Sequence, residues 1–165
     1  MNRPLISRRF DLLLLCVFGA CLLSPSPVSL ATEAPAPNPC ALLDASYVKP
    51  LLGNKPVAQN EGGSCTWTAT TSSKKLVVIT YKKVVGAPSD IGFMSALRSA
   101  LKRGRVINEP GLGDQAFANL ESSGVSMVIL KRSRLLQLQY QTGNAGTTKD
   151  VDALRPLAKK AVASY

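Results

Sequence analysis

Histidine is absent from all 165 residues of the chain, and aromatic residues make up only 5% of it. The sequence therefore lacks the base of Ser-His and Cys-His nucleophile pairs, the commonest zinc ligand, and the one side chain that titrates unaided near neutral pH. So few aromatic residues also argue against an aromatic-lined binding groove. These absences predict a protein that is not an enzyme and that carries no cofactor and no metal ion.

Acidic residues are scarce as well: 20 Lys and Arg face 10 Asp and Glu, which gives a formal net charge of +10. Hydrophobic residues make up 45% of the chain, enough to form a core, and the length fits one modest domain.

The first 31 residues have the pattern of an export signal. A basic start precedes an apolar run over residues 12–23, and Ser29-Leu30-Ala31 offers small residues for cleavage before Thr32. The basic start consists of Arg3, Arg8 and Arg9. The apolar run is shorter than the ~20 residues that a transmembrane helix needs. The sequence therefore predicts a periplasmic or secreted protein.

Two alternatives concern how the leader is processed. Phe18-Gly19-Ala20-Cys21 loosely resembles a lipidation box, so a lipid anchor at Cys21 would make the protein a membrane-anchored lipoprotein. Arg8-Arg9 faintly resembles a twin-arginine signal, so the export route stays open.

Removal of residues 1–31 takes away three arginines and one aspartate, and so leaves a net charge of +8. It also removes two of the four cysteines. Because Cys40 and Cys65 are then the only pair in an oxidising compartment, we predict a structural disulfide between them.

Residues 32–39 form a linker rich in proline and alanine, and residues 40–165 form a single domain. Apolar spacing predicts a helix over 41–52, ended by Gly53 and interrupted near Pro50. A second helix begins at Ser89 and ends at Gly104. A third helix closes the chain. The residues that should face inward are Ile91, Met94, Leu97 and Leu101 in the second helix, and Val151, Leu154, Leu157, Ala161 and Val162 in the third.

Alternating or β-branched runs predict five strands. They cover residues 66–72, 76–85, 115–120, 125–131 and 135–141, and the last two form a hairpin around Arg132-Ser133-Arg134. We therefore expect an α+β domain: an antiparallel sheet of about five strands with helices packed on one face. The order of elements also suggests a loose two-fold structural repeat.

Four short motifs follow one another along the chain: Pro39-Cys40-Ala41-Leu42-Leu43, Leu51-Leu52-Gly53, Cys65-Thr66-Trp67, and the block from Gly111 to Phe117 (G-L-G-D-Q-A-F). In this order they resemble a group of small exported bacterial proteins of unknown function, many of them lipoproteins. The resemblance implies an exported α+β domain with the Cys40–Cys65 bridge, and it implies no reaction.

Several short patterns could carry chemistry, and each has a simpler structural explanation. Ser46/Lys49 and Ser99/Lys102 match the S-x-x-K pair of penicillin-recognising enzymes, but the chain is about half the length of that fold. Gly111-Leu112-Gly113-Asp114 suggests a phosphate loop, yet a strand follows it, so we expect glycines that permit a tight turn. Asp150 and Asp152 should cap the last helix.

Two surfaces remain as candidates for binding. The first is a polar strand face, made of Thr66, Thr68, Thr70, Gln137, Gln139 and Gln141. The second is a basic rim, made of Lys74, Lys75, Lys102, Arg103, Arg105, Lys131, Arg132 and Arg134. Either surface could instead be an ordinary solvated face. Trp67 should anchor the core beside the disulfide.

The sequence therefore predicts a non-catalytic binding domain of the bacterial periplasm or envelope, which recognises a protein or an anionic envelope ligand. Nucleic acid is not an expected partner, because neither interleaved aromatics nor a groove-entering helix is present. The alternative is a periplasmic inhibitor or immunity protein that blocks a secreted enzyme or toxin.

Overall fold

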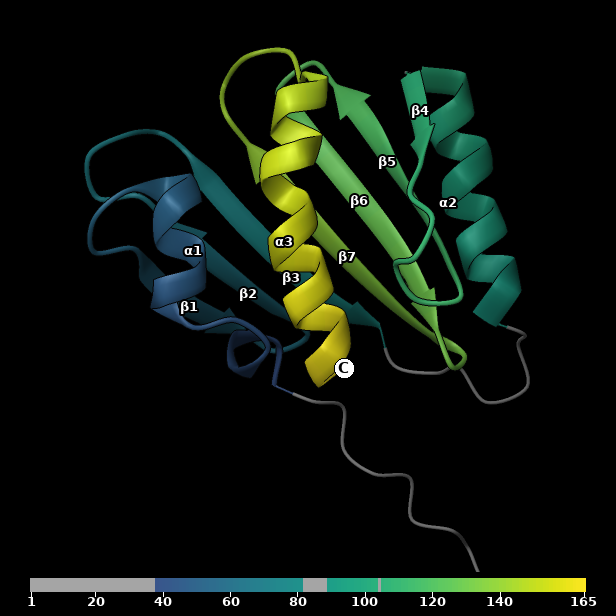
Figure 1. Cartoon of the computed structure of the whole chain (residues 1–165), viewed down its shortest axis with the longest axis horizontal. Helices are drawn as coiled ribbons and strands as arrows, with labels where there is room; N and C mark the ends of the chain where they lie inside the picture. The colour runs from purple at the N-terminus through teal and green to yellow at the C-terminus, as the bar shows by residue number, and fades with distance from the viewer. Residues whose placement is uncertain (1–37, 82–88, 104) are drawn as a thin grey trace, which may run out of the picture. The chain divides into compact units, whose positions relative to one another are not determined.

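In a computed structural model the described residues, 38–81, 89–103 and 105–165, build one seven-stranded antiparallel sheet (Figure 1). The strands are β1 (Val57–Glu61), β2 (Ser64–Thr68), β3 (Lys75–Tyr81), β4 (Arg105–Asn108), β5 (Gln115–Glu121), β6 (Gly124–Lys131) and β7 (Arg134–Gln141). Their order across the sheet is β1-β2-β3-β7-β6-β5-β4, so the last strand in the sequence lies between β3 and β6.

Some of the sequence predictions fall outside the described residues. These are the export signal at 1–31 with Cys21, residues 32–37 of the linker, and residues 82–85 at the end of one predicted strand.

The predicted α+β class with an antiparallel sheet is confirmed, but the described residues form seven strands rather than about five. Strands β1 and β4 were not predicted from the sequence. All five residues of β1 are exposed, so this strand lacks the apolar alternation by which strands are recognised. Strand β4 has only four residues and follows a helix almost directly.

The first predicted helix is divided into two pieces. A short 3-10 helix, η1 (Pro39–Ala41), comes first, and α1 (Ala45–Leu52) follows it. Helix α1 begins where the Asp44 carboxylate accepts hydrogen bonds from two backbone N–H groups. The break therefore lies before Asp44 and not at Pro50, which is inside α1. Gly53 ends α1 with a φ of 89°, as predicted.

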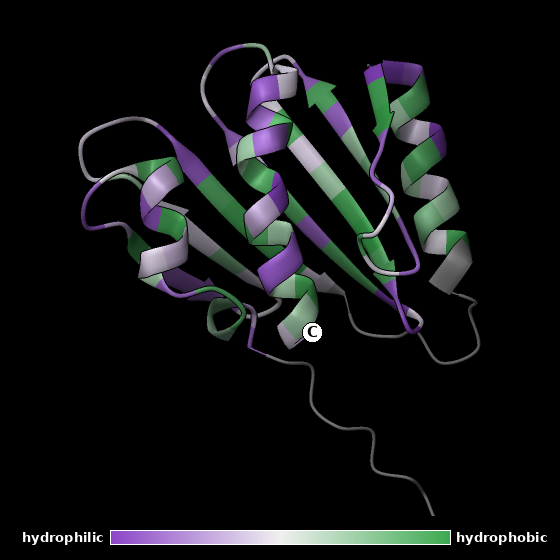
Figure 2. Cartoon of the chain, in the orientation of Figure 1, coloured by the Kyte–Doolittle hydropathy of each residue, from purple (hydrophilic) through white to green (hydrophobic). Residues whose placement is uncertain are grey.

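Helix α3 (Thr148–Ser164) begins with a capping box, in which Thr147 and Asp150 each bond the other's backbone N–H. Apolar and polar residues alternate along it at helical spacing (Figure 2). All five residues predicted to face inward are buried: Val151, Leu154, Leu157, Ala161 and Val162. With α1 it covers one face of the sheet and forms the main core (Figure 1).

Helix α2 (Ser89–Arg103) covers part of the opposite face of the sheet. Along β5, Ala116 and Ala118 belong to the main core, whereas Phe117 belongs to a second core with α2. Because neighbouring residues of a strand point to opposite faces, the two cores lie on opposite sides of the sheet. The prediction that the helices pack on one face is therefore wrong for α2. One helix followed by three strands occurs twice in the chain, as α1 with β1–β3 and as α2 with β4–β6, and α1 and α2 lie on opposite faces of the sheet.

The face of α2 that packs on the sheet differs from the predicted one. Phe93 and Ala100 are buried there, with Ala96 and Leu97 partly buried. Ile91, Met94 and Leu101, which were predicted to face inward, are 61%, 41% and 62% exposed.

The predicted disulfide is present between Cys40 and Cys65, and it joins η1 to β2. Trp67, two residues further along β2, is buried in the main core, as predicted. None of the helices in the described ranges combines the length and the apolar character needed to cross a membrane.

Candidate functional site

Most of the predicted polar strand face comes together on the face of the sheet that α2 shares. Thr66 of β2, Val77 of β3 and Gln139 of β7 are register neighbours, and they form one row across three strands. The next row contains Thr68, Lys75 and Gln141. We call the residues of these rows, with Ile79 and Gln137 of the row on the other side, the polar sheet face.

One predicted residue does not belong to the polar sheet face. Thr70 lies beyond the end of β2, and its hydroxyl donates to the carbonyl oxygen of Asn54 at 3.1 Å. Thr70 therefore fastens the loop after α1 to the loop after β2.

The side chains of this face differ in how firmly they are held. The Gln137 amide donates to the hydroxyl of buried Ser126 at 2.9 Å, so this side chain is fixed toward the sheet. Thr66, Thr68, Gln139 and Gln141 make no side-chain hydrogen bond with any residue of the described ranges. Their hydroxyl and amide groups are therefore available to a partner.

The centre of the polar sheet face is apolar, which the sequence analysis did not anticipate. Val77 and Ile79 of β3 are half-buried. Val77 lies between Thr66 and Gln139, and Ile79 lies between Ser64 and Gln137. The signal was present in the sequence, since β3 reads as a nearly continuous apolar run. Such a run predicts a central strand, and β3 does lie inside the sheet, between β2 and β7. The face that carries Val77 and Ile79 nevertheless stays partly open.

The predicted basic rim divides into separate groups. Lys74 and Lys75 lie at the start of β3, and Arg105 lies at the start of β4, at the same end of the sheet. Four strand spacings, about 19 Å, separate these two places. Lys102 and Arg103 end α2, and the remaining group, Lys131, Arg132 and Arg134, lies around the β6–β7 turn at the opposite end. The chain therefore has no continuous rim formed by these eight residues.

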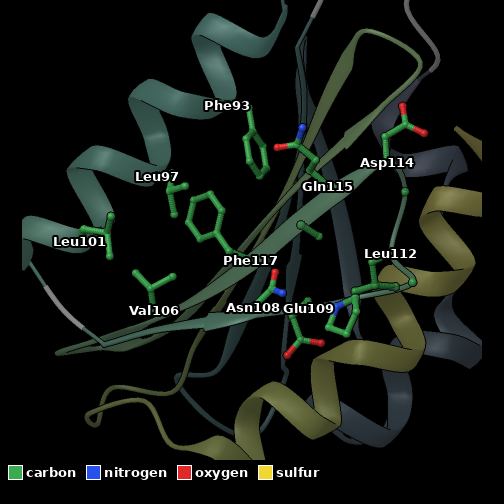
Figure 3. A pocket seen from close by; sticks show the side chains of 14 residues that line it. Phe93, Leu97, Leu101, Val106, Asn108, Glu109, Leu112, Asp114, Gln115 and Phe117 are labelled. Carbon is green, nitrogen blue, oxygen red and sulfur yellow. The ribbon is translucent and has the colours of Figure 1, made fainter.

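A cleft of about 610 Å³ lies between α2 and the segment that joins β4 to β5 (Figure 3). Phe93 and Leu97 of α2 point toward Phe117 of β5 across it. The Phe93 and Phe117 rings meet edge to face, with centroids 5.4 Å apart. The walls are mainly apolar, and all of the lining residues lie between Phe93 and Phe117 in the sequence. Sequence patterns do not reveal the cleft because it depends on how α2 packs against β4 and β5.

Glu109, in the lining of the cleft, is the one acidic side chain that is buried among the described residues. Its two carboxylate oxygens accept from the Arg155 guanidinium of α3 at 2.7 and 2.9 Å. Arg155 also donates to Asp152 at 2.7 Å. The bond to Glu109, followed by the bond to Asp152, raises the pKa of Arg155 above its ordinary value. Since Arg155 stays charged and occupies both oxygens, Glu109 holds the β4–β5 segment on α3.

The glycine-rich block acts as a turn, as predicted. Gly111 and Gly113 have φ values of 80° and 63°, which favour glycine. Directly after them, the Asp114 carboxylate accepts from the backbone N–H of Arg132 at 2.7 Å, and the Asp114 N–H donates to Leu130 at 2.8 Å. The block therefore fixes the start of β5 against the β6–β7 hairpin.

Ser46 and the pair Asp150 and Asp152 have structural partners. The Ser46 hydroxyl donates to Asp44, and this bond lowers the pKa of the Asp44 carboxyl, so Ser46 belongs to the start of α1. Asp150 caps α3 as predicted, while Asp152 pairs with Arg155. Within the part of the chain that the structure describes, no group of three or more Cys, Asp or Glu side chains is placed to hold a metal ion.

Comparison of the chain with protein-family models, with curated proteins and with solved structures finds no match.

Proposed function

We propose that residues 40–165 form a non-catalytic, exported domain that binds another protein through the polar sheet face. The observation that carries this proposal is the arrangement of that face, in which Val77 and Ile79 form a half-buried apolar centre. The threonine hydroxyls of β2 and the amides of Gln139 and Gln141 border this centre and make no side-chain hydrogen bond within the described residues. Protein–protein interfaces are commonly built in this way, with an apolar centre and a polar border.

The rigidity of the sheet also supports a protein partner. Thr66 and Gln139 lie within the paired parts of β2 and β7, both of which pair with β3. Their backbone is ordered before binding, so binding orders only side chains, at about 0.5–1.5 kcal/mol for each long one. Among the predicted basic residues only Lys75 lies within the face itself, which favours a protein over a highly charged anionic ligand.

The experiment places charge in the centre of this face. Thr66→Lys with Gln139→Lys adds two cations, one on each side of Val77, where a bound partner would have to bury them. The full chain and this variant are used as bait for envelope extracts of the source bacterium, and captured proteins are compared by mass spectrometry. We expect a partner that the unmodified chain retains and the double variant loses.

The matched control is Ala153→Lys with Ala163→Lys, which adds the same charge at exposed positions of α3. This control should capture the same partner as the unmodified chain. The proposal is wrong if both double variants behave alike, or if no protein is enriched over a bait-free column at low and at moderate salt.

A further inference from the structure

The outward side of α2 carries large apolar residues that the fold leaves exposed. Ile91 and Leu101 are 61% and 62% exposed, and Met94 is 41% exposed. They are three of the five large hydrophobic side chains that stand exposed within the described ranges. The helix packs through Phe93 and Ala100 instead, so these residues do not support the second core.

Cations lie between these apolar residues. Arg98 and Lys102 are exposed, and at their spacing they lie on the same side of the helix as Ile91. Neither makes an ion pair with a residue that the structure describes. Arg103 bonds back to the carbonyl oxygen of Ser99 at 3.2 Å. The second half of α2 contains no acidic residue, so its positive charge is not compensated within the helix.

The apolar residues of α2 continue into the cleft. Leu101 and Leu97 line it together with Phe93 (Figure 3). The outward side of the helix and the mouth of the cleft therefore form one continuous surface, on which Arg98 and Lys102 lie among the apolar residues. We call Ile91, Met94, Arg98, Leu101 and Lys102 the α2 outer surface.

We infer that the α2 outer surface binds the surface of an anionic lipid bilayer, with the helix lying in the plane of the membrane. A helix that carries cations beside exposed large apolar residues is typical of interfacial membrane helices. Arg98 and Lys102 would meet the acidic head groups, and Ile91, Met94 and Leu101 would enter the upper acyl region. This site is separate from the polar sheet face, and neither proposal depends on the other.

The test is sedimentation with lipid vesicles. The full chain is recovered from a bacterial host with Cys21→Ser in every sample, so that no lipid is attached, and mass spectrometry confirms that all samples share one N terminus. Vesicles contain phosphatidylcholine alone or an equimolar mixture with phosphatidylglycerol. We expect binding to the anionic vesicles, weaker binding to the neutral ones, and a decrease as salt is raised to about 0.5 M.

Arg98→Gln with Lys102→Gln should weaken partitioning about 25-fold, since each cation near an anionic surface contributes about fivefold. The control pair Lys149→Gln with Lys159→Gln removes the same charge from exposed positions of α3 and should bind as the unmodified chain does. Equal weakening by the two pairs, unchanged binding of the α2 pair, or no preference for anionic vesicles would each overturn the inference.

Ile91→Ser with Leu101→Ser tests the orientation of the helix. This pair should also weaken binding at least fivefold, whereas Val57→Ser, at an exposed position of β1, should leave it unchanged. Circular dichroism confirms that each variant is folded. Full vesicle affinity of the serine pair would show that the apolar residues do not enter the membrane, and would overturn the proposed binding mode.

Discussion

Gly111 and Gly113 share a left-handed backbone conformation but have different surroundings. A Cβ atom added to Gly113 would lie 2.5 Å from the carbonyl oxygen of Leu130, a backbone atom of β6 that cannot easily move. A Cβ atom added to Gly111 would meet nothing within 4 Å. The first glycine of the block therefore serves only the turn, and the second also serves the close approach of two strands.

The pair allows these two effects to be separated. We expect Gly111→Ala to lower the free energy of unfolding by about 1–2 kcal/mol, the cost of the left-handed conformation alone. Gly113→Ala should lower it by at least about 2 kcal/mol more, because the clash adds to the same cost. Urea denaturation followed by circular dichroism measures both. Equal losses for the two variants would contradict the close approach.

For single residues, the sequence predicted which side chains share the polar sheet face, but it did not predict where that face ends. Strict alternation in β7 places Gln137, Gln139 and Gln141 on one side regardless of what surrounds them. The same alternation runs through Thr70, and nothing in the sequence shows that strand pairing stops at Thr68. Glu109 was missed for a related reason: its partner Arg155 is 46 residues away, so their pairing depends on the completed fold.

The residues of helix α2 that pack on the sheet are not the ones that its apolar spacing predicts. Ile91, Met94 and Leu101 recur at helical spacing, and on hydrophobicity alone they are the better core residues. The structure instead buries the Phe93 ring against Phe117, and small residues face the sheet. At Gly92, a Cβ atom would lie 2.9 Å from Leu135. Which of two overlapping stripes is buried depends on the shape of the opposing strands, and one sequence segment does not contain that information.

The apolar spacing predicts that Leu101 contributes more to the free energy of unfolding than Phe93 does. The structure predicts the reverse, and two substitutions on α2 test this. Phe93→Ala should lower the free energy of unfolding by about 3 kcal/mol or more, because it empties a buried ring site. Leu101→Ala should change it by less than about 0.5 kcal/mol, since this side chain is largely exposed. Guanidinium denaturation of both variants checks the expectation. A larger loss for Leu101→Ala would mean that the helix is turned the other way.

Across the whole molecule, the disulfide fastens the N-terminal part of the domain. It closes a loop of 25 residues between η1 and β2. Loop-closure entropy predicts that Cys40→Ala with Cys65→Ala lowers the free energy of unfolding by about 3 kcal/mol. Denaturation of the double variant beside the oxidised chain measures this difference. Reductant should then have no effect on the variant, and an unchanged midpoint relative to the oxidised chain would contradict a stabilising role.

The overall class followed from the sequence because alternating strands and amphipathic helices are local patterns. The strand order did not follow from it. The pairing of β3 with β7 joins Lys75 to Gln141, and neighbouring runs of sequence give no sign of a contact across that separation. A basic rim required several element ends to meet, and because the strand order does not follow from the sequence, the division of the basic residues between two ends of the sheet could not be predicted.

The central place of β7 has a consequence for how the chain is made. Strands β1–β3 and β4–β6 are joined in the sheet only through β7. A nascent chain that emerges N terminus first therefore holds two half-sheets that cannot meet until Arg134 and the residues after it are released. A chain that ends between β6 and β7 would contain both half-sheets, and the edges of β3 and β6 that pair with β7 would stay open. Such truncated products would not form a smaller functional domain, and quality-control proteases would degrade them.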